Sequence, residues 1–283
     1  MRVHIISDSA CDMTQREAKE QGVIILPLKT IIDGVEYMDG VSITTEEFYD
    51  KLEHCKELPT TSQLTPVEVT DALRPIVENG EEAVIITLAG KLSGTVQSAA
   101  LAAAEFDGKV WVVDSDNVTI GQNILLRYAI RLRDQGLSGR EIAEKLEQAK
   151  PRICLLARVD TLEYLVRGGR LSKTAGIVGT LLNIKPVLCV EDGEIKVLGK
   201  ARGSRQSNNM LTEFIEKKGG IDFSMPVMLA YSGTDDALLK GYIENSRALW
   251  GDHLDELPVT MIGSTVSTHA GPGAIGVAFF AKL

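Results

Sequence analysis

The stretch AVIITLAGKLSGTVQSAALAAAEF, residues Ala83–Phe106, decides the fold class. It opens with a β-branched apolar run, Ala83–Leu88, which predicts a buried strand. It closes with an alanine-rich run, Thr95–Phe106, which predicts a helix. Between them, Leu92-Ser93-Gly94-Thr95 supplies the hydroxyl and glycine residues typical of a turn into a helix. We therefore interpret the stretch as one strand–turn–helix unit of an α/β sheet.

Similar units surround this stretch in the N-terminal half. Three further apolar runs predict strands, at Val3–Ile6, Val23–Leu26 and Val110–Val113. Further helices are predicted at Thr45–Lys56, Pro66–Asn79, Ile120–Gln135 and Ser138–Lys150. Helix-start chemistry supports two of these, because Thr65 precedes Pro66 and Ser138 stands three residues before Glu141. This alternation predicts an N-terminal α/β domain, residues 1–155, with a largely parallel sheet.

The second half adds a hairpin to the alternation. The apolar runs Lys185–Val190 and Glu194–Gly199 flank Glu191-Asp192-Gly193, and an Asp-Gly turn between apolar runs predicts a β-hairpin. The other predicted elements are strands at Cys154–Ala157, Val227–Tyr231, Val259–Ser264 and Ala274–Phe280 and helices at Thr161–Val166, Ser204–Lys218 and Asp235–Trp250. We expect a second domain, residues 156–283, of α/β or α+β class with a mixed sheet.

Composition excludes several classes of protein. The 283 residues carry 30 basic and 39 acidic side chains, a net charge of −9, which argues against a general nucleic-acid binder. No apolar run approaches the roughly 18 residues of a membrane span, and the N-terminus lacks a signal-peptide pattern. The four cysteines form no C-x-x-C pair, which argues against a disulfide framework or a zinc site. We expect a cytoplasmic protein without a metal or a cofactor.

Two hydroxyl-bearing segments could carry chemistry. Ser93, Gly94 and Thr95 stand at a predicted helix N-terminus, where unpaired N–H groups and the helix dipole favour an anion. Thr61 and Ser62 lie in a loop before the helix that Pro66 begins, and they could donate hydrogen bonds to the same anion. Each segment has a structural alternative, since serine and threonine are also ordinary helix caps and turn residues.

His269 is the most informative of the four histidines. It stands in Ser267-Thr268-His269-Ala270-Gly271-Pro272-Gly273, which we interpret as a turn between the last two strands. The glycines indicate backbone packed close to something, so this loop could approach a cleft between the domains. A structural role is the alternative for a single histidine.

Two alternative functions follow from residue types. A serine hydrolase could use Ser93, His269 and an acid such as Asp8 or Asp114, although Gly90-Lys91-Leu92-Ser93-Gly94 is not a G-x-S-x-G elbow. A sugar- or phosphate-binding protein could place a phosphate at the Ser93 helix start, although only Lys91 offers a positive charge nearby. The sequence contains no G-x-x-x-x-G-K-[ST], G-x-G-x-x-G or H-E-x-x-H motif.

A basic segment stands out within the acidic chain. From Arg158 to Arg205 there are nine basic and five acidic residues, which gives a net charge of +4. Such a patch is usually a solvated face, and the alternative is a docking surface for an acidic partner or a phosphate.

Taken in order along the chain, seven short segments resemble the DegV family of bacterial fatty-acid-binding proteins. These segments are Ser7-Asp8-Ser9-Ala10-Cys11-Asp12, Thr61-Ser62-Gln63, Leu92-Ser93-Gly94-Thr95, Asp114-Ser115, Tyr164-Leu165-Val166-Arg167-Gly168-Gly169-Arg170-Leu171-Ser172, Lys185-Pro186 and Thr268-His269-Ala270-Gly271-Pro272-Gly273. Each is short, but together they span nearly the whole chain.

The resemblance implies two α/β domains with a long-chain fatty acid buried between them. By the family pattern, Thr61 and Ser93 would hold the carboxylate, and the head-group site would be completed by Ser62, Gly94, Thr95 and His269. The chain would be a lipid-binding subunit without a complete active site of its own. It would present its ligand to a separate ATP-dependent fatty acid kinase that makes acyl phosphate for phospholipid synthesis. Arg170 and Arg202 match basic family positions and would serve the kinase-docking or phosphotransfer face.

Overall fold

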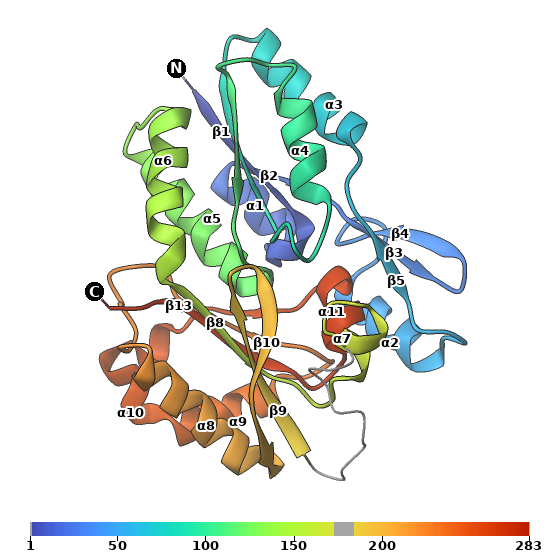
Figure 1. Ribbon diagram of the computed structural model, residues 1–283, viewed down its shortest axis with the longest axis vertical. Helices are drawn as coiled ribbons and strands as arrows, with labels where there is room; N and C mark the ends of the chain where they lie inside the picture. The colour runs from blue at the N-terminus through green and yellow to red at the C-terminus, as the bar shows by residue number, and fades with distance from the viewer. Residues whose placement is uncertain (1, 173–183, 283) are drawn as a thin grey trace.

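A computed structural model describes residues 2–172 and 184–282. Lys173, which belongs to the basic segment, lies outside these ranges. The described residues form two α/β halves, one above the other in Figure 1, each built on its own sheet.

The N-terminal half contains a four-stranded parallel sheet. Its strand order is β2-β1-β6-β7. The strands are β1 (Val3–Asp8), β2 (Val23–Leu26), β6 (Glu82–Thr87) and β7 (Val110–Asp114). Because all four strands are parallel, their carboxyl ends meet at one edge, which is where α/β sheets of this kind bind ligands.

Helices cover both faces of this sheet (Figure 1). They are α1 (Gln15–Gln21), α3 (Pro66–Glu78), α4 (Thr95–Ala103), α5 (Thr119–Asp134) and α6 (Gly139–Ala149), with a 3-10 turn at Ser9–Cys11. The predicted capping boxes are present, since the Thr65 hydroxyl accepts from the Glu68 N–H and the Ser138 hydroxyl from the Glu141 N–H. Helix α5 is buried on most sides because it packs between the four-stranded and the six-stranded sheet of the molecule.

The C-terminal half contains a six-stranded mixed sheet of order β10-β9-β8-β13-β11-β12. The strands are β8 (Ile153–Arg158), β9 (Ile184–Glu191), β10 (Glu194–Arg202), β11 (Met228–Tyr231), β12 (Val259–Met261) and β13 (Ile275–Phe280). The predicted hairpin joins β9 to β10, and positive φ angles of 52° at Asp192 and 72° at Gly193 fit its tight turn. The predicted α/β class with a parallel and a mixed sheet is confirmed.

The helices of this half are α7 (Glu163–Arg167), α8 (Gly203–Lys217), α9 (Ala237–Asn245), α10 (Arg247–Trp250) and α11 (Ser264–Ala270), with 3-10 turns at Lys150–Arg152 and Gly251–Glu256. Helices α8, α9 and α10 cover the outer face of the six-stranded sheet. The six-stranded sheet begins at Ile153, so the expected domain boundary at residue 155 falls inside β8.

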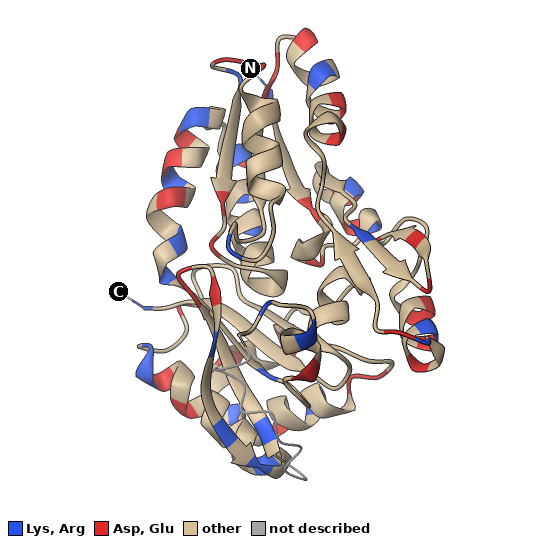
Figure 2. Ribbon diagram, turned by 45° about the vertical axis from the view of Figure 1, so that its right-hand side comes forward, with Lys and Arg blue, Asp and Glu red and all other residues tan. Residues whose placement is uncertain are grey.

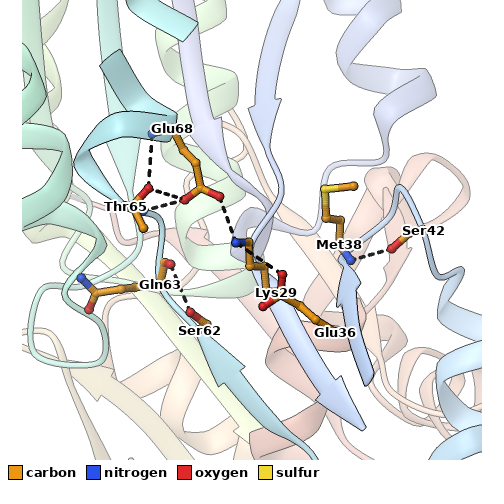
Figure 3. Close-up of polar contacts among 8 residues, drawn as sticks. All are labelled: Lys29, Glu36, Met38, Ser42, Ser62, Gln63, Thr65 and Glu68. Atoms are coloured by element: carbon orange, nitrogen blue, oxygen red, sulfur yellow. Dashed lines mark hydrogen bonds and ion pairs between the residues drawn. The ribbon is translucent and has the colours of Figure 1, made fainter. Parts of the chain in front are cut away.

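A small antiparallel sheet, absent from the sequence-based prediction, projects from the N-terminal half (Figure 1). Its order is β4-β3-β5, with β3 (Lys29–Ile32), β4 (Val35–Met38) and β5 (Thr60–Ser62), and helix α2 (Thr45–His54) lies between β4 and β5 in the chain. Lys29 ties this sheet to α3, because its ammonium lies 3.4 Å from Glu36 and 3.1 Å from Glu68 (Figure 3). Strand β5, which was expected to be a loop, pairs with β3 of this sheet and leads into α3.

Two other predictions about secondary structure were wrong. The predicted strand Val259–Ser264 ends at Met261, and His269 lies on helix α11 rather than on a turn between strands. The predicted helix Asp235–Trp250 is broken at Ser246, whose hydroxyl donates to the Tyr242 carbonyl at 2.6 Å and accepts from the Trp250 indole at 3.0 Å. The Ser246 side chain thus bonds one helix, α9, and the other, α10, at the point where the two meet.

Candidate functional site

A cavity of about 210 Å³ lies between the two sheets. One side is the carboxyl edge of the four-stranded sheet and the other is the inner face of the six-stranded sheet. Its lining comprises Ala10, Leu28, Thr61, Ser62, Gln63, Leu88, Leu92, Ser93, Gly94, Val118, Thr119, Ile120, Leu155, Ala157, Val159, Leu165, Arg170, Leu188, Cys189, Val190, Ile195, Ile262, Thr265, Val266, His269, Ala270, Ala274, Ile275 and Gly276. Most of these side chains are apolar, and the polar ones come from a few segments.

The wall formed by the six-stranded sheet is apolar. Leu155 and Ala157 of β8 and Val159 just after the strand line the cavity, as the two-residue period of a strand predicts. Ala157 is paired with Gly276 of β13 on one side and with Leu188 of β9 on the other. Two small residues side by side leave space that larger side chains would fill.

The opposite end carries most of the predicted polar residues. Thr61, Ser62, Ser93, Gly94 and His269 all line the cavity. They come from β5, the loop before α4, and α11, so the fold brings together residues separated by up to 208 positions in the chain. The predicted clustering of these hydroxyl and imidazole groups is therefore present in the structure.

Thr95 does not line the cavity itself. It is buried, and its hydroxyl lies 3.0 Å from the Ser93 hydroxyl, which also accepts from the Thr95 N–H at 3.3 Å. The N-cap of α4 is Gly94, which has no side chain to cap the helix. Ser93 is thus not a conventional N-cap, and its hydroxyl faces the cavity with Thr95 behind it.

His269 and Thr61 form a defined pair. The His269 Nε2 atom lies 2.8 Å from the Thr61 hydroxyl, whereas the buried Nδ1 atom has no hydrogen-bond partner. A buried, unpaired N–H costs more than a bare acceptor, so we assign the proton to Nε2. Nε2 then donates to the Thr61 oxygen, which leaves the Thr61 hydroxyl proton free to donate into the cavity.

Burial and a positive neighbour keep this imidazole neutral. Desolvation, and to a lesser extent the charge of Arg170, lower the pKa of His269 to about 4. At neutral pH the ring is therefore a neutral hydrogen-bond donor and a poor general base.

Gln63, which lines the cavity, and Gly168, which lies against His269, were not selected by the sequence analysis. The Gln63 amide donates to the Ser98 hydroxyl at 3.2 Å, which docks the end of β5 on the first turn of α4. A Cβ atom at Gly94 would lie 2.1 Å from the Gln63 side-chain oxygen, and one at Gly168 would lie 2.2 Å from His269 Nδ1. The Gly-Gly-Arg segment was the signal that could have revealed Gly168, because a glycine often marks a close approach.

Arg170 and Arg202 lie in different environments. Arg170 lines the cavity half-buried, and its guanidinium donates to the Leu92 carbonyl at 3.1 Å and to the Gly168 carbonyl at 2.7 Å. Burial lowers the pKa of Arg170 from its usual value. Arg202 is exposed at the end of β10, among the basic residues of β9 and β10 seen in Figure 2, and it does not line the cavity. Of the two arginines, only Arg170 lines the same cavity as Thr61, Ser93 and His269.

The residues of the hydrolase hypothesis do not form a triad. His269 is paired with Thr61 and not with Ser93. Asp8 accepts hydrogen bonds from two backbone N–H groups and a glutamine amide, and Asp114 accepts from two backbone N–H groups. In the part of the chain that the structure describes, no carboxylate orients the His269 ring, so nucleophile activation of this kind has no geometric support.

Two further observations concern metals and membranes. Across residues 2–172 and 184–282, no three His, Cys, Asp or Glu side chains are arranged to hold a metal ion. No helix in those ranges is long and apolar enough to cross a membrane. The four cysteines are all free thiols.

The fold and the cavity define a two-domain α/β protein with a largely apolar pocket between its two sheets. The chain belongs to the DegV family, because the model of that family, described as an uncharacterised protein of the DegV family, matches residues 2–282. A DegV domain-containing protein from Caldanaerobacter subterraneus is 36% identical over 289 residues and is matched over 99% of both chains.

Solved structures of similar proteins carry ligand information. A DegV family protein from Thermus thermophilus, described as binding fatty acid, superposes with a TM-score of 0.88 at 30% identity and full coverage of both chains. A stearic acid-binding protein from Eubacterium ventriosum superposes with a TM-score of 0.83 at 28% identity, covering 97% of this chain and 96% of its own. The predicted family membership is confirmed.

Proposed function

We propose that the protein binds a long-chain fatty acid in the cavity between its two sheets. The observation that carries this proposal is the asymmetry of the cavity, whose lining is mostly apolar but includes the Thr61–His269 pair and the Ser93 hydroxyl. A fatty acid has the same asymmetry. The fatty acids named for the similar proteins from Thermus thermophilus and Eubacterium ventriosum support the same ligand class.

The apolar wall would supply most of the affinity. Burying about 14 methylene groups at about 0.8 kcal/mol each contributes on the order of 11 kcal/mol before the cost of ordering the chain. Each neutral hydrogen bond at the head group adds only about 1 kcal/mol net. A ligand held in this way must be largely enclosed, which agrees with a cavity between two sheets.

The polar end would orient the carboxylate. The Thr61 hydroxyl, directed by His269, and the Ser93 hydroxyl would donate to it, while Ser62, Gly94 and the N-terminus of α4 would complete the head-group site. Thr95 would act from behind by bonding to Ser93. Half-buried Arg170 would add a favourable positive potential.

We further propose that the chain is a cytoplasmic binding subunit rather than a complete enzyme. It would present the carboxylate to a separate ATP-dependent fatty acid kinase, and the acyl phosphate would serve phospholipid synthesis. Arg170, beside the head group, and exposed Arg202, on the basic face of β9 and β10, would lie toward the kinase. The ligand would need no metal or cofactor for binding.

Ligand identity is tested by extracting lipid from the purified protein and analysing it by mass spectrometry. We expect about one long-chain fatty acid per chain, and delipidated protein should rebind it. Recovery of no fatty acid, together with failure of the delipidated protein to take one up, would contradict the proposal. Labelling of Ser93 by a fluorophosphonate probe would instead favour the hydrolase.

The kinase step is tested separately. Fatty-acid-loaded protein is mixed with ATP, with and without a purified bacterial fatty acid kinase, and acyl phosphate is trapped with hydroxylamine as the hydroxamate. We expect product only when the kinase is present. Product from this chain and ATP alone would show that it is an enzyme, and no product in either mixture would contradict its role as a kinase substrate subunit.

A further inference from the structure

Helix α11 belongs to the C-terminal half of the chain but is anchored in the N-terminal half. Four of its residues, Thr265, Val266, His269 and Ala270, line the cavity. The helix packs against α7 of its own half, and also against β3, β5, α2 and the Ser9–Cys11 turn, all of which precede α3 in the chain. Its position therefore sets part of the cavity wall.

Two buried carboxylates hold the start of this helix. Asp12 accepts from the Gly263 N–H at 2.8 Å, and Asp39 accepts from the Ser264 N–H at 3.0 Å and from the Ser264 hydroxyl at 2.7 Å. A Cβ atom at Gly263 would lie 3.1 Å from one Asp12 oxygen and 3.2 Å from one Asp39 oxygen. The N–H groups at the start of α11 thus donate to two side chains that lie more than 200 positions away in the sequence.

The two carboxylates are themselves fixed. The second Asp12 oxygen accepts from the Thr119 hydroxyl, and the second Asp39 oxygen accepts from the Ser9 hydroxyl at 2.9 Å. Asp12 and Asp39 are only 6% and 5% exposed, and neither lines the cavity. Thr119 does line it and adopts a φ of 49°, which a β-branched residue keeps only when its surroundings enforce it.

The other end of α11 carries the imidazole of the head-group site. His269 is five residues beyond Ser264, and its Nε2 atom meets Thr61. Ser267 is held against Tyr49 of α2 at 2.5 Å. Over so short a helix, a displacement of the first turn is transmitted to His269 because the helix has no room to bend.

We propose that Asp12 and Asp39 are positioning residues of the head-group site, which fix α11 so that His269 directs the Thr61 hydroxyl toward the ligand carboxylate. This inference rests on the proposed function. It assigns the two carboxylates a role in recognising the head group of the ligand, in addition to any contribution to folding.

Glu82 provides a matched control for that distinction. It is a buried carboxylate that accepts from the Gly139 N–H at 2.8 Å and so holds the start of α6. The chemistry resembles that of Asp39 on α11, but neither Glu82 nor α6 lines the cavity. If Asp39 had only a structural role, the Asp39 and Glu82 variants would have the same effect on ligand affinity.

The experiment compares two ligands that differ only at the head group, octadecanoic acid and octadecanol, in delipidated protein. Because burial raises the pKa of Asp12 to about 8, its protonation changes near neutral pH, and the variants are made at Asp39. We expect Asp39→Ala to weaken binding of the acid by about tenfold and of the alcohol by less than about twofold, a difference equal to about one hydrogen bond. Glu82→Ala should leave the ratio of the two affinities unchanged. Asp39→Asn retains an oxygen that can accept from Ser264 and should restore most of the ratio.

Gly263→Ala is the second variant, to be used if Asp39→Ala does not fold. The φ of Gly263 is −70°, so alanine is permitted there, and its Cβ would press on both carboxylates without removing a hydrogen-bonding group. NMR titration of His269 gives a readout independent of ligand, since release of α11 should raise the imidazole pKa from about 4 toward 6.5.

The possible results are distinguishable. A selective loss of acid binding with a raised His269 pKa supports the positioning role. Equal losses for acid and alcohol, an Asp39→Ala effect no larger than that of Glu82→Ala, or an unchanged His269 titration would overturn it. Failure of the wild-type protein to bind octadecanoic acid would instead overturn the proposed function.

Discussion

At one end of the cavity, Thr61, Ser93 and His269 come from a strand end, a loop and a short helix, and each is held by a directional hydrogen bond. The facing wall is built from alternate residues of regular strands, such as Ala157, whose contribution is the volume they leave free. Binding at the polar end depends on hydrogen-bond geometry and protonation state, whereas binding along the apolar wall depends on the size of the side chains that line it. Changes to the two regions should therefore have different consequences for binding.

The largest effect should come from filling the apolar wall. Ala157→Leu adds three carbons beside Gly276, and losing room for three or four methylenes at about 0.8 kcal/mol each should weaken octadecanoic acid by roughly 100-fold. Titration of delipidated protein with fatty acids of decreasing length measures the effect. A dodecanoic acid affinity close to wild type provides the control, and an unchanged octadecanoic acid affinity would show that the tail lies elsewhere.

The hydroxyl end should contribute less. Thr61→Ala combined with Ser93→Ala removes two neutral donors worth about 1 kcal/mol each, so binding of the acid should weaken by about 30-fold. Binding of octadecanol should change far less. Because Thr61→Ala leaves the His269 Nε2 proton unpaired, the delipidated double variant should keep its fold but unfold at a lower temperature than the wild type. Equal affinity of the double variant and the wild type for the acid would remove both residues from the site.

The protonation of His269 should link this end to pH. Its folded-state pKa of about 4 lies below the usual 6.5, so its contribution to stability is complete above pH 6.5 and is lost as the pH falls toward 4. Between pH 7 and about pH 5.5, this single group should lower the free energy of unfolding by on the order of 1 kcal/mol. Denaturant unfolding of the wild type and His269→Gln at both pH values isolates that contribution. Identical pH dependence of the two proteins would contradict a neutral, buried imidazole.

The smallest effect should come from two glycine substitutions at the polar end. Gly168→Ala presses on the His269 ring and should weaken acid binding by roughly fivefold, about one hydrogen bond. Gly94→Ala meets the Gln63 side chain and would disturb its bond to Ser98, but it does not touch His269, so its effect on acid binding should be smaller. Isothermal titration of both variants tests this order, and a larger effect of Gly94→Ala would reverse our view of which contact matters.

The polar end was the more predictable region from sequence. Hydroxyl residues at a helix start, as in Leu92-Ser93-Gly94-Thr95, carry their signal within a few residues. The capping boxes at Thr65 and Ser138 and the turn at Asp192 were predictable for the same reason. By contrast, nothing in the sequence distinguishes Ala157, which lines a cavity, from an ordinary core alanine.

Helix α11 shows why longer-range features escaped prediction. The run Val259–Ser264 is β-branched and favours a strand, and Ser264–Ala270 has weak helix propensity. The helix forms because Asp12 and Asp39, far away in the chain, accept its first N–H groups. Strands β3, β4 and β5 escaped for a related reason, since three- and four-residue strands gain their stability from pairing partners that the local sequence does not reveal.

The central claim is that one elongated ligand spans both regions of the cavity. A crystal structure of the protein saturated with octadecanoic acid tests it most directly. We predict continuous density that starts within hydrogen-bonding distance of the Thr61 and Ser93 hydroxyls and runs along β8 past Ala157. Density for the carboxylate away from those hydroxyls, or a filled space between the sheets with no density for an alkyl chain, would contradict the account.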